Sequence, residues 1–74
     1  MNPISAFQRT GRTLHARRRL LGLTLGTLAA ESGLSPALLS ALERGEYDPR
    51  SLHLAAVQAL TRILDLGPST LHPD

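Results

Sequence analysis

Arginine side chains dominate the charged chemistry of this 74-residue chain. All eight basic residues are arginine, and the formal net charge is +2. Five of them lie within the first nineteen positions: Arg9, Arg12, Arg17, Arg18 and Arg19. A guanidinium forks onto phosphate and carboxylate oxygens better than the ammonium of lysine does. A GC-rich genome would explain the missing lysine, but not the clustering, so we expect a polarised molecule with a basic N-terminal helix.

Residues that could support catalysis or metal binding are scattered. His15, His53 and His72 have no acidic residue at ligand spacing beside two of them, and Ser40 has no histidine nearby in sequence. The glycines do not form the strand–loop–helix pattern that binds a nucleotide phosphate. We therefore predict no enzyme, no catalytic residue, no metal, no cofactor and no small-molecule ligand.

Composition favours one small all-α domain. The chain has no cysteine, which excludes disulfide bridges and thiolate metal sites. Leucine and alanine supply most of the apolar residues and aromatic residues make up 3%, a balance typical of helices. No apolar run approaches the roughly 20 residues that span a bilayer, and the N-terminus lacks the pattern of a signal peptide. We predict a cytoplasmic single domain over residues 1–74, with no membrane contact, a core at about 5–66, and frayed ends at 1–4 and 72–74.

The first helix is predicted from Ser5 to Leu21. One face carries four apolar or small residues and one arginine at helical spacing: Phe7, Gly11, Leu14, Arg18 and Leu21. The other arginines of this segment lie off that face, where we expect them to be solvated.

Two short helices joined by a tight turn follow. Thr24 caps the first, which runs to about Ser32, and Gly33 closes it in a position that suits a left-handed backbone. Ser35 caps the second, with Pro36 at its first position, and this helix runs to about position 44. Its inward residues are expected to be Leu39 and Leu42, with Leu34 below them. Three apolar residues are expected to point outward: Ala37, Leu38 and Ala41.

The last helix is predicted to start at Ser51. Its apolar stripe comprises Leu52, Ala55, Ala56, Ala59, Leu60 and Ile63. A glycine–proline pair at 67–68 breaks the chain, and residues 69–71 are predicted to form one more turn. Leu64, Leu66 and Leu71 either contact a second subunit or complete the monomer core, and the sequence favours neither.

A set of short motifs resembles the Cro and phage-repressor type of helix-turn-helix domain. The motifs are Gly11 to Arg18, GLT at 22–24, LA at 28–29, GLS at 33–35, LS at 39–40, LERG at 42–45, and Pro49. The resemblance covers about residues 7–64. Related sequences tend to carry an apolar residue where Arg17 stands, so we expect Leu20 or Ala16 to compensate in the packing. It implies a compact bundle of four to five short helices, in which the second helix crosses the DNA backbone and the third enters the major groove.

The resemblance also implies a function. It indicates a sequence-selective regulator of transcription, a repressor that binds double-stranded DNA as a homodimer. The DNA-binding residues expected by position are Thr24, Leu25, Ser35, Pro36, Ala37, Leu38, Ser40, Ala41, Arg44 and Arg50. Arg18 and Glu43 are expected to form a structural ion pair beneath this surface, because an unpaired buried charge costs several kcal/mol.

The apolar third helix leaves a second hypothesis open. Its outward residues cannot make the bidentate hydrogen bonds that discriminate bases. Leu25 stands where related sequences often have glutamine, while Glu46 and Asp48 repel phosphate. The domain either packs these apolar side chains on thymine methyl groups or uses them to bind a protein partner, as an adaptor or an antitoxin-like subunit.

Overall fold

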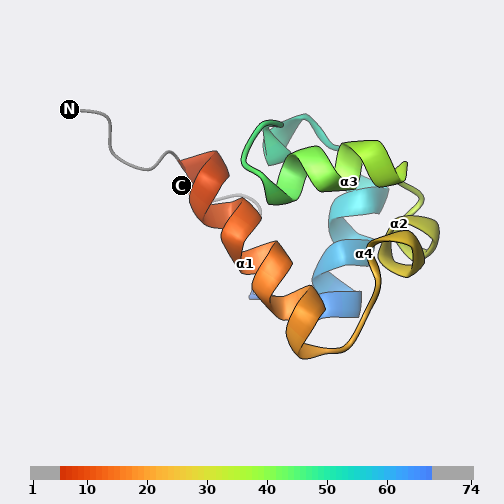
Figure 1. The fold of residues 1–74 in the computed structure, drawn as a ribbon. Coiled ribbons are helices and arrows are strands. Elements are labelled where there is room, and N and C mark those ends of the chain that lie inside the picture. Colours follow the sequence, from red (N-terminus) through yellow and green to blue (C-terminus); the bar gives the residue numbers. More distant parts are fainter. Residues whose placement is uncertain (1–5, 68–74) are drawn as a thin grey trace.

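The computed structural model describes residues 6–67 and confirms the all-α fold class within them (Figure 1). Its elements are α1 (Ala6–Leu20), α2 (Leu25–Ser32), α3 (Pro36–Glu43), a 3₁₀ turn η1 (Pro49–Ser51) and α4 (Leu54–Leu64). None of the helices in this range has the length and hydropathy needed to cross a bilayer. The predicted frayed ends, the turn at 69–71 and Leu71 lie outside the described residues.

Local capping sets the α2–turn–α3 unit. The Thr24 hydroxyl accepts a hydrogen bond from the Thr27 N–H (3.0 Å), and the Ser35 hydroxyl accepts one from the Leu38 N–H (3.1 Å). Between the two helices, Gly33 has φ +76°, a left-handed conformation that glycine adopts without steric cost. These three positions turn the chain within three residues, as the sequence predicts.

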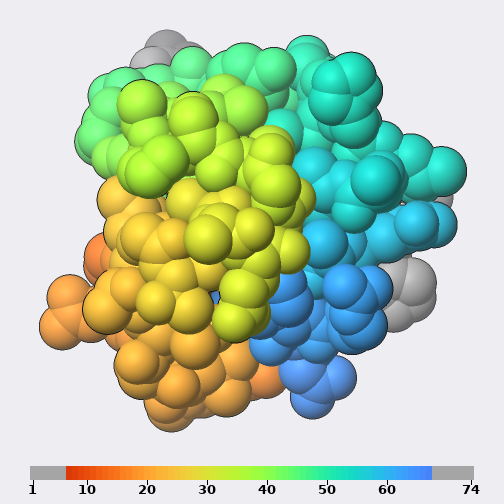
Figure 2. Space-filling model, turned by 90° about the vertical axis from the view of Figure 1, so that its right-hand side faces the viewer, coloured from red at the N-terminus to blue at the C-terminus, as the bar shows by residue number. Residues whose placement is uncertain are grey.

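The core lies where α1, α2, α3 and α4 meet. Six leucines are almost completely buried there: Leu14, Leu28, Leu39, Leu42, Leu60 and Leu64. In Figure 2, α2 occupies the centre of one face of the molecule, with the first turn of α3 above it and α4 to its right. The outer surface of α2 therefore lies between α3 and α4.

The helix α1 crosses the C-terminal end of α3 at very short range. A Cβ atom added at Gly11 would meet the Leu42 carbonyl oxygen and would lie 2.6 Å from the Glu43 carbonyl oxygen. Because the neighbouring atoms belong to the backbone, only glycine fits at this crossing. The close approach brings the middle of α1 next to the last turn of α3.

The predicted start of the last helix at Ser51 is wrong. The Asp48 side chain accepts a hydrogen bond from the Arg50 N–H (2.9 Å), which caps a separate 3₁₀ turn opened by Pro49. The chain is then extended at the next two residues, and α4 begins at Leu54. With this register Ala55 is exposed, contrary to the predicted stripe, and Val57 is buried in its place.

Three predictions about the first helix are also wrong: that Arg17 is solvated, that Leu21 lies on the core-facing side, and that Leu20 or Ala16 compensates for Arg17. Arg17 is half-buried, not solvated, and its Nε donates to the Leu64 carbonyl oxygen at the end of α4 (3.1 Å). Leu20 and Leu21 are 73% and 44% exposed, and Ala16 is exposed, so none of them fills the core. The guanidinium of Arg17 satisfies a helix terminus, which makes a compensating apolar residue unnecessary.

The alternatives for the C-terminal leucines are resolved for Leu64. Leu64 is fully buried and Leu66 packs partly buried against the core. Leu64 therefore completes the monomer core, and a subunit contact through its side chain is excluded.

Candidate nucleic-acid interface

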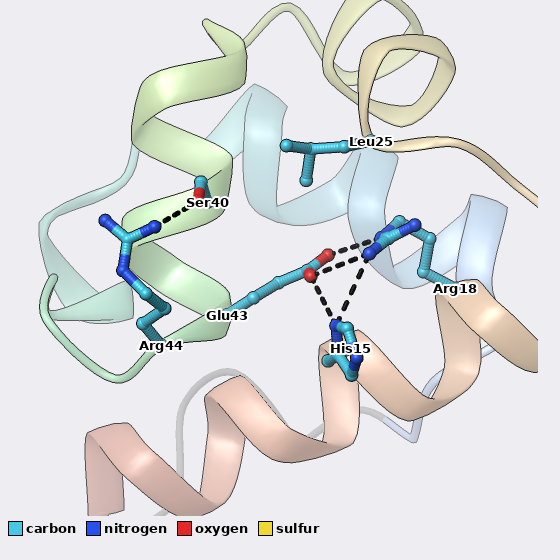
Figure 3. A pocket seen from close by; sticks show the side chains of 6 residues that line it. All are labelled: His15, Arg18, Leu25, Ser40, Glu43 and Arg44. Atoms are coloured by element: carbon cyan, nitrogen blue, oxygen red, sulfur yellow. Dashed lines mark hydrogen bonds and ion pairs between the residues drawn. The ribbon is translucent and has the colours of Figure 1, made fainter.

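An open pocket of about 400 Å³ lies between α1, the start of α2 and the outer side of α3 (Figure 3). It is lined by His15, Arg18, Leu25, Ser40, Glu43 and Arg44. Three of the residues expected at the DNA interface, Leu25, Ser40 and Arg44, thus surround one concavity. Leu25, from the start of α2, contributes an apolar side chain to one side of the pocket (Figure 3).

The floor of the pocket is an ion pair between α1 and α3. Arg18 Nε lies 2.7 Å from Glu43 Oε2, and Arg18 Nη2 lies 3.1 Å from Glu43 Oε1. The guanidinium also donates to the Leu23 carbonyl oxygen (2.9 Å). The two side chains are only 11% and 7% exposed, so the pair holds α1, the α1–α2 loop and the end of α3 together.

His15 completes this cluster. Its Nδ1 lies 2.8 Å from Glu43 Oε1, and its side chain is half-exposed. Burial of the Glu43 carboxyl raises its pKa, but hydrogen bonds from Arg18 and His15 outweigh that effect and hold the pKa below its ordinary value. The hydrogen bond to Glu43 likewise raises the pKa of Arg18. The carboxyl of Glu43 is therefore held in its charged form.

The outer side of α3 is less exposed than the sequence predicts. Pro36 and Ala37, in its first turn, are exposed, whereas Leu38 and Ala41 are half-buried. Leu39 and Leu42 face the core as expected, with Leu34 partly buried beside them. The start of α3 is therefore its most exposed part.

The hydroxyl residues expected at this surface cap helices. Thr24 and Ser35 precede α2 and α3, are exposed, and each accept a hydrogen bond from a backbone N–H of the first turn. The remaining free N–H groups of these turns form positive helix ends of the kind that bind phosphate. Leu25, at the start of α2, lines the pocket, whereas α3 lines it through Ser40 and Glu43, beyond its first turn.

Arg44 and Arg50, the two arginines expected at phosphates, are each bound to a carboxylate two residues away. Arg44 Nη2 lies 3.0 Å from Glu46 Oε1, and its Nη1 donates to the Ser40 hydroxyl. Arg50 forms two parallel hydrogen bonds with Asp48, both 3.1 Å long. Both arginine side chains remain more than half exposed.

Sequence reasoning missed the roles of His15, Glu46 and Asp48. His15 precedes Arg18 by three residues, a spacing that puts both on one face of a helix, so its place beside the ion pair could have been found. Each acidic residue stands two positions from an arginine, which is a weaker signal. Within residues 6–67 no group of three or more metal-binding side chains is arranged around a common point.

Comparison with known proteins agrees with this geometry. A family model described as "Helix-turn-helix domain" matches residues 9–73. A solved structure, the restriction-modification controller protein C.AhdI from Aeromonas hydrophila, is similar with a TM-score of 0.71 and 31% sequence identity. The match covers 88% of this chain and 94% of that one. No curated protein sequence matches the chain.

Proposed function

Because the chain belongs to the helix-turn-helix domain family, we propose that it is a sequence-selective regulator of transcription that represses a promoter as a DNA-bound dimer. The resemblance to the Cro and phage-repressor type of domain, stated from the sequence, is confirmed by both comparisons. In this proposal α3 enters the major groove and α2 lies across the backbone.

The observation that carries the proposal is the orientation of α3. Its core-facing residues Leu39 and Leu42 are buried while Pro36 and Ala37, at its start, are exposed. A duplex can therefore meet the N-terminal turn of α3 without unfolding any part of the domain. Arg44 at its end and Arg50 in η1 supply exposed cations for phosphates on the flank.

Base selection in this proposal relies on apolar contact and on DNA shape. Ala37 and the half-buried Leu38 and Ala41 can pack on thymine methyl groups, and Ser40 already accepts a hydrogen bond from Arg44. Sequence-dependent deformability of the duplex adds selectivity at base pairs that the protein does not touch. We expect moderate discrimination between sites rather than recognition of single bases.

The second candidate is a protein-binding module that uses the same face. The low polarity of Ala37, Leu38 and Ala41 favours it. The partial burial of Leu38 and Ala41 reduces the apolar area on offer, so we rank DNA binding first.

The experiment is a fluorescence-anisotropy titration of random and selected duplexes with the wild type and two matched variants. Ala37→Glu places a carboxylate in the exposed first turn of α3, where acidic residues suit a helix N-terminus and folding is preserved. Ala55→Glu makes the same change at the exposed second position of α4, a helix to which the proposal assigns no DNA contact. Ala37→Glu should weaken binding at least about tenfold and Ala55→Glu by less than about threefold, since charge at the interface costs several kcal/mol.

Salt and mass complete the test. The wild-type affinity should fall steeply with salt concentration, because phosphate contacts release counterions. Light scattering should give a mass of twice the 8.0 kDa of one chain, as the proposed dimer requires. Absence of any salt-sensitive DNA binding, or equal effects of the two glutamate variants, would refute the proposed function and leave the protein-binding module.

A further inference from the structure

We propose that Glu46 and Asp48 act as built-in competitors of DNA phosphate, which bind Arg44 and Arg50 in the free protein and so lower its affinity for any duplex. This inference rests on the proposed function, since it concerns the same arginines. It assigns these two carboxylates a regulatory role in addition to the simple repulsion expected from the sequence.

The Arg50–Asp48 contact has the geometry of a phosphate contact. Arg50 Nε and Nη2 each lie 3.1 Å from a different oxygen of Asp48, a two-pronged arrangement that a phosphate group would also satisfy. The guanidinium carbon is 5.5 Å from the centre of the Phe7 ring, which supports it on a second side. Arg50 is thus held in place with two of its donors occupied by a carboxylate.

The Arg44–Glu46 contact, at the end of α3, has one hydrogen bond to the carboxylate where the Arg50–Asp48 contact has two. Arg44 donates through Nη2 to Glu46 and through Nη1 to the Ser40 hydroxyl. In Figure 3 the side chain of Arg44 turns back along α3 toward Ser40, away from Glu43. The terminal nitrogens that a phosphate would use are therefore engaged within the protein.

Charge balance explains why these contacts reduce affinity. Each guanidinium and its carboxylate form a pair with no net charge, so the flank of α3 offers a phosphate much less attraction than two free arginines would. To bind, the phosphate either displaces the carboxylate or shares the guanidinium with it, and sharing places two anions close together. The side chains of Arg44, Glu46 and Arg50 are more than half exposed, and that of Asp48 is 28% exposed, so we expect the effect to be moderate and to weaken with salt.

The test measures binding of a random duplex by three charge-neutralised variants. Glu46→Gln and Asp48→Asn each remove one competitor, and asparagine keeps an oxygen that can cap η1. Glu31→Gln is the matched control, because Glu31 is exposed and has no ion pair among the described residues. All three raise the net charge by one unit. At about 50 mM salt, Glu46→Gln and Asp48→Asn should bind about two- to fivefold more tightly than Glu31→Gln.

A double substitution separates competition from a general charge effect. In an Arg50→Gln background, Asp48→Asn should give no gain beyond that of Glu31→Gln, because the arginine that it frees is absent. The excess gain of the single variants should also shrink at about 200 mM salt, where the screening length is shorter.

The outcomes distinguish this inference from the proposed function. Tighter binding by Glu46→Gln and Asp48→Asn than by Glu31→Gln supports competition, even if the wild type alone binds too weakly to measure. DNA binding with equal gains in all three variants overturns the inference and leaves the proposed function standing. Reduced binding by Asp48→Asn would mean that the carboxylate positions Arg50 for DNA, which also overturns it. No binding by any protein overturns both.

Discussion

The crossing of α1 over α3 predicts opposite effects for the same substitution at two helical glycines. Gly11 lies in α1, where an added methyl group would meet two carbonyl oxygens of α3, while Gly26 lies in α2 with nothing within 4 Å of the added atom. Neither glycine has a positive φ. Gly11→Ala and Gly26→Ala therefore differ only in what surrounds the new methyl group.

The magnitude follows from two opposing contributions. Alanine restricts the unfolded chain and stabilises a compatible position by about 0.4–1 kcal/mol, which is the whole effect expected at Gly26. Overpacking costs about 1–3 kcal/mol, and Gly11 belongs at the upper end because backbone atoms cannot move aside as a side chain can. The free energies of unfolding of the two variants should therefore differ by about 2–3 kcal/mol.

Thermal and urea unfolding, followed by circular dichroism, measure this difference. In a domain of this size 1 kcal/mol shifts the melting temperature by about 4–8 °C, so the two variants should melt roughly 10 °C or more apart, on opposite sides of the wild type. Gly11→Ser, which adds the same Cβ, should behave like Gly11→Ala. Equal stability of Gly11→Ala and the wild type would refute the close crossing of α1 and α3.

Three further predictions concern single side chains. Glu43→Gln should lower stability at neutral pH by about 2 kcal/mol, since it leaves Arg18 poorly paired. Because the pKa of Glu43 is depressed in the fold, wild-type stability should fall as pH drops below about 4.5. The stability of the variant, measured by urea unfolding, should change less with pH in that range. Ser35→Ala should cost about 1 kcal/mol by urea unfolding through loss of the α3 cap, whereas Ser35→Asp should cost less than half of that. Asp65 has a left-handed backbone conformation, with φ +54°. In thermal melts, Asp65→Gly should therefore stabilise the protein by about 0.5 kcal/mol, and Asp65→Ala should destabilise it. An alanine variant as stable as the wild type would contradict the left-handed conformation.

The sequence predicts best where local chemistry decides the structure. The helix-turn-helix unit follows from Thr24, Gly33, Ser35 and Pro36, whose effects act within one turn of the chain. Spacing alone places Arg18 on a core-facing stripe, where its charge requires an opposite charge. Glu43 as the partner was implied by the resemblance to the Cro and phage-repressor type of domain.

The rest depends on contacts that spacing does not encode. The start of α4 is delayed because Asp48 caps η1, and a short 3₁₀ turn has no periodicity to detect. Arg17 binds the end of α4, 47 residues away in sequence, a contact that only the tertiary fold creates. The engagement of Arg44 and Arg50 by neighbouring acids likewise depends on rotamers, since the same residues could equally extend into the solvent.

The way in which α3 packs against the rest of the domain has a consequence for engineering the protein. Every strong attachment of this helix, through Leu39, Leu42 and Glu43, lies on its inner side or at its last turn. Ala37, in its first turn, is exposed and does not belong to the core. Side chains of many kinds can therefore be exchanged at this position while the scaffold keeps its shape, so a family of binders with different targets could be made from one unchanged interior.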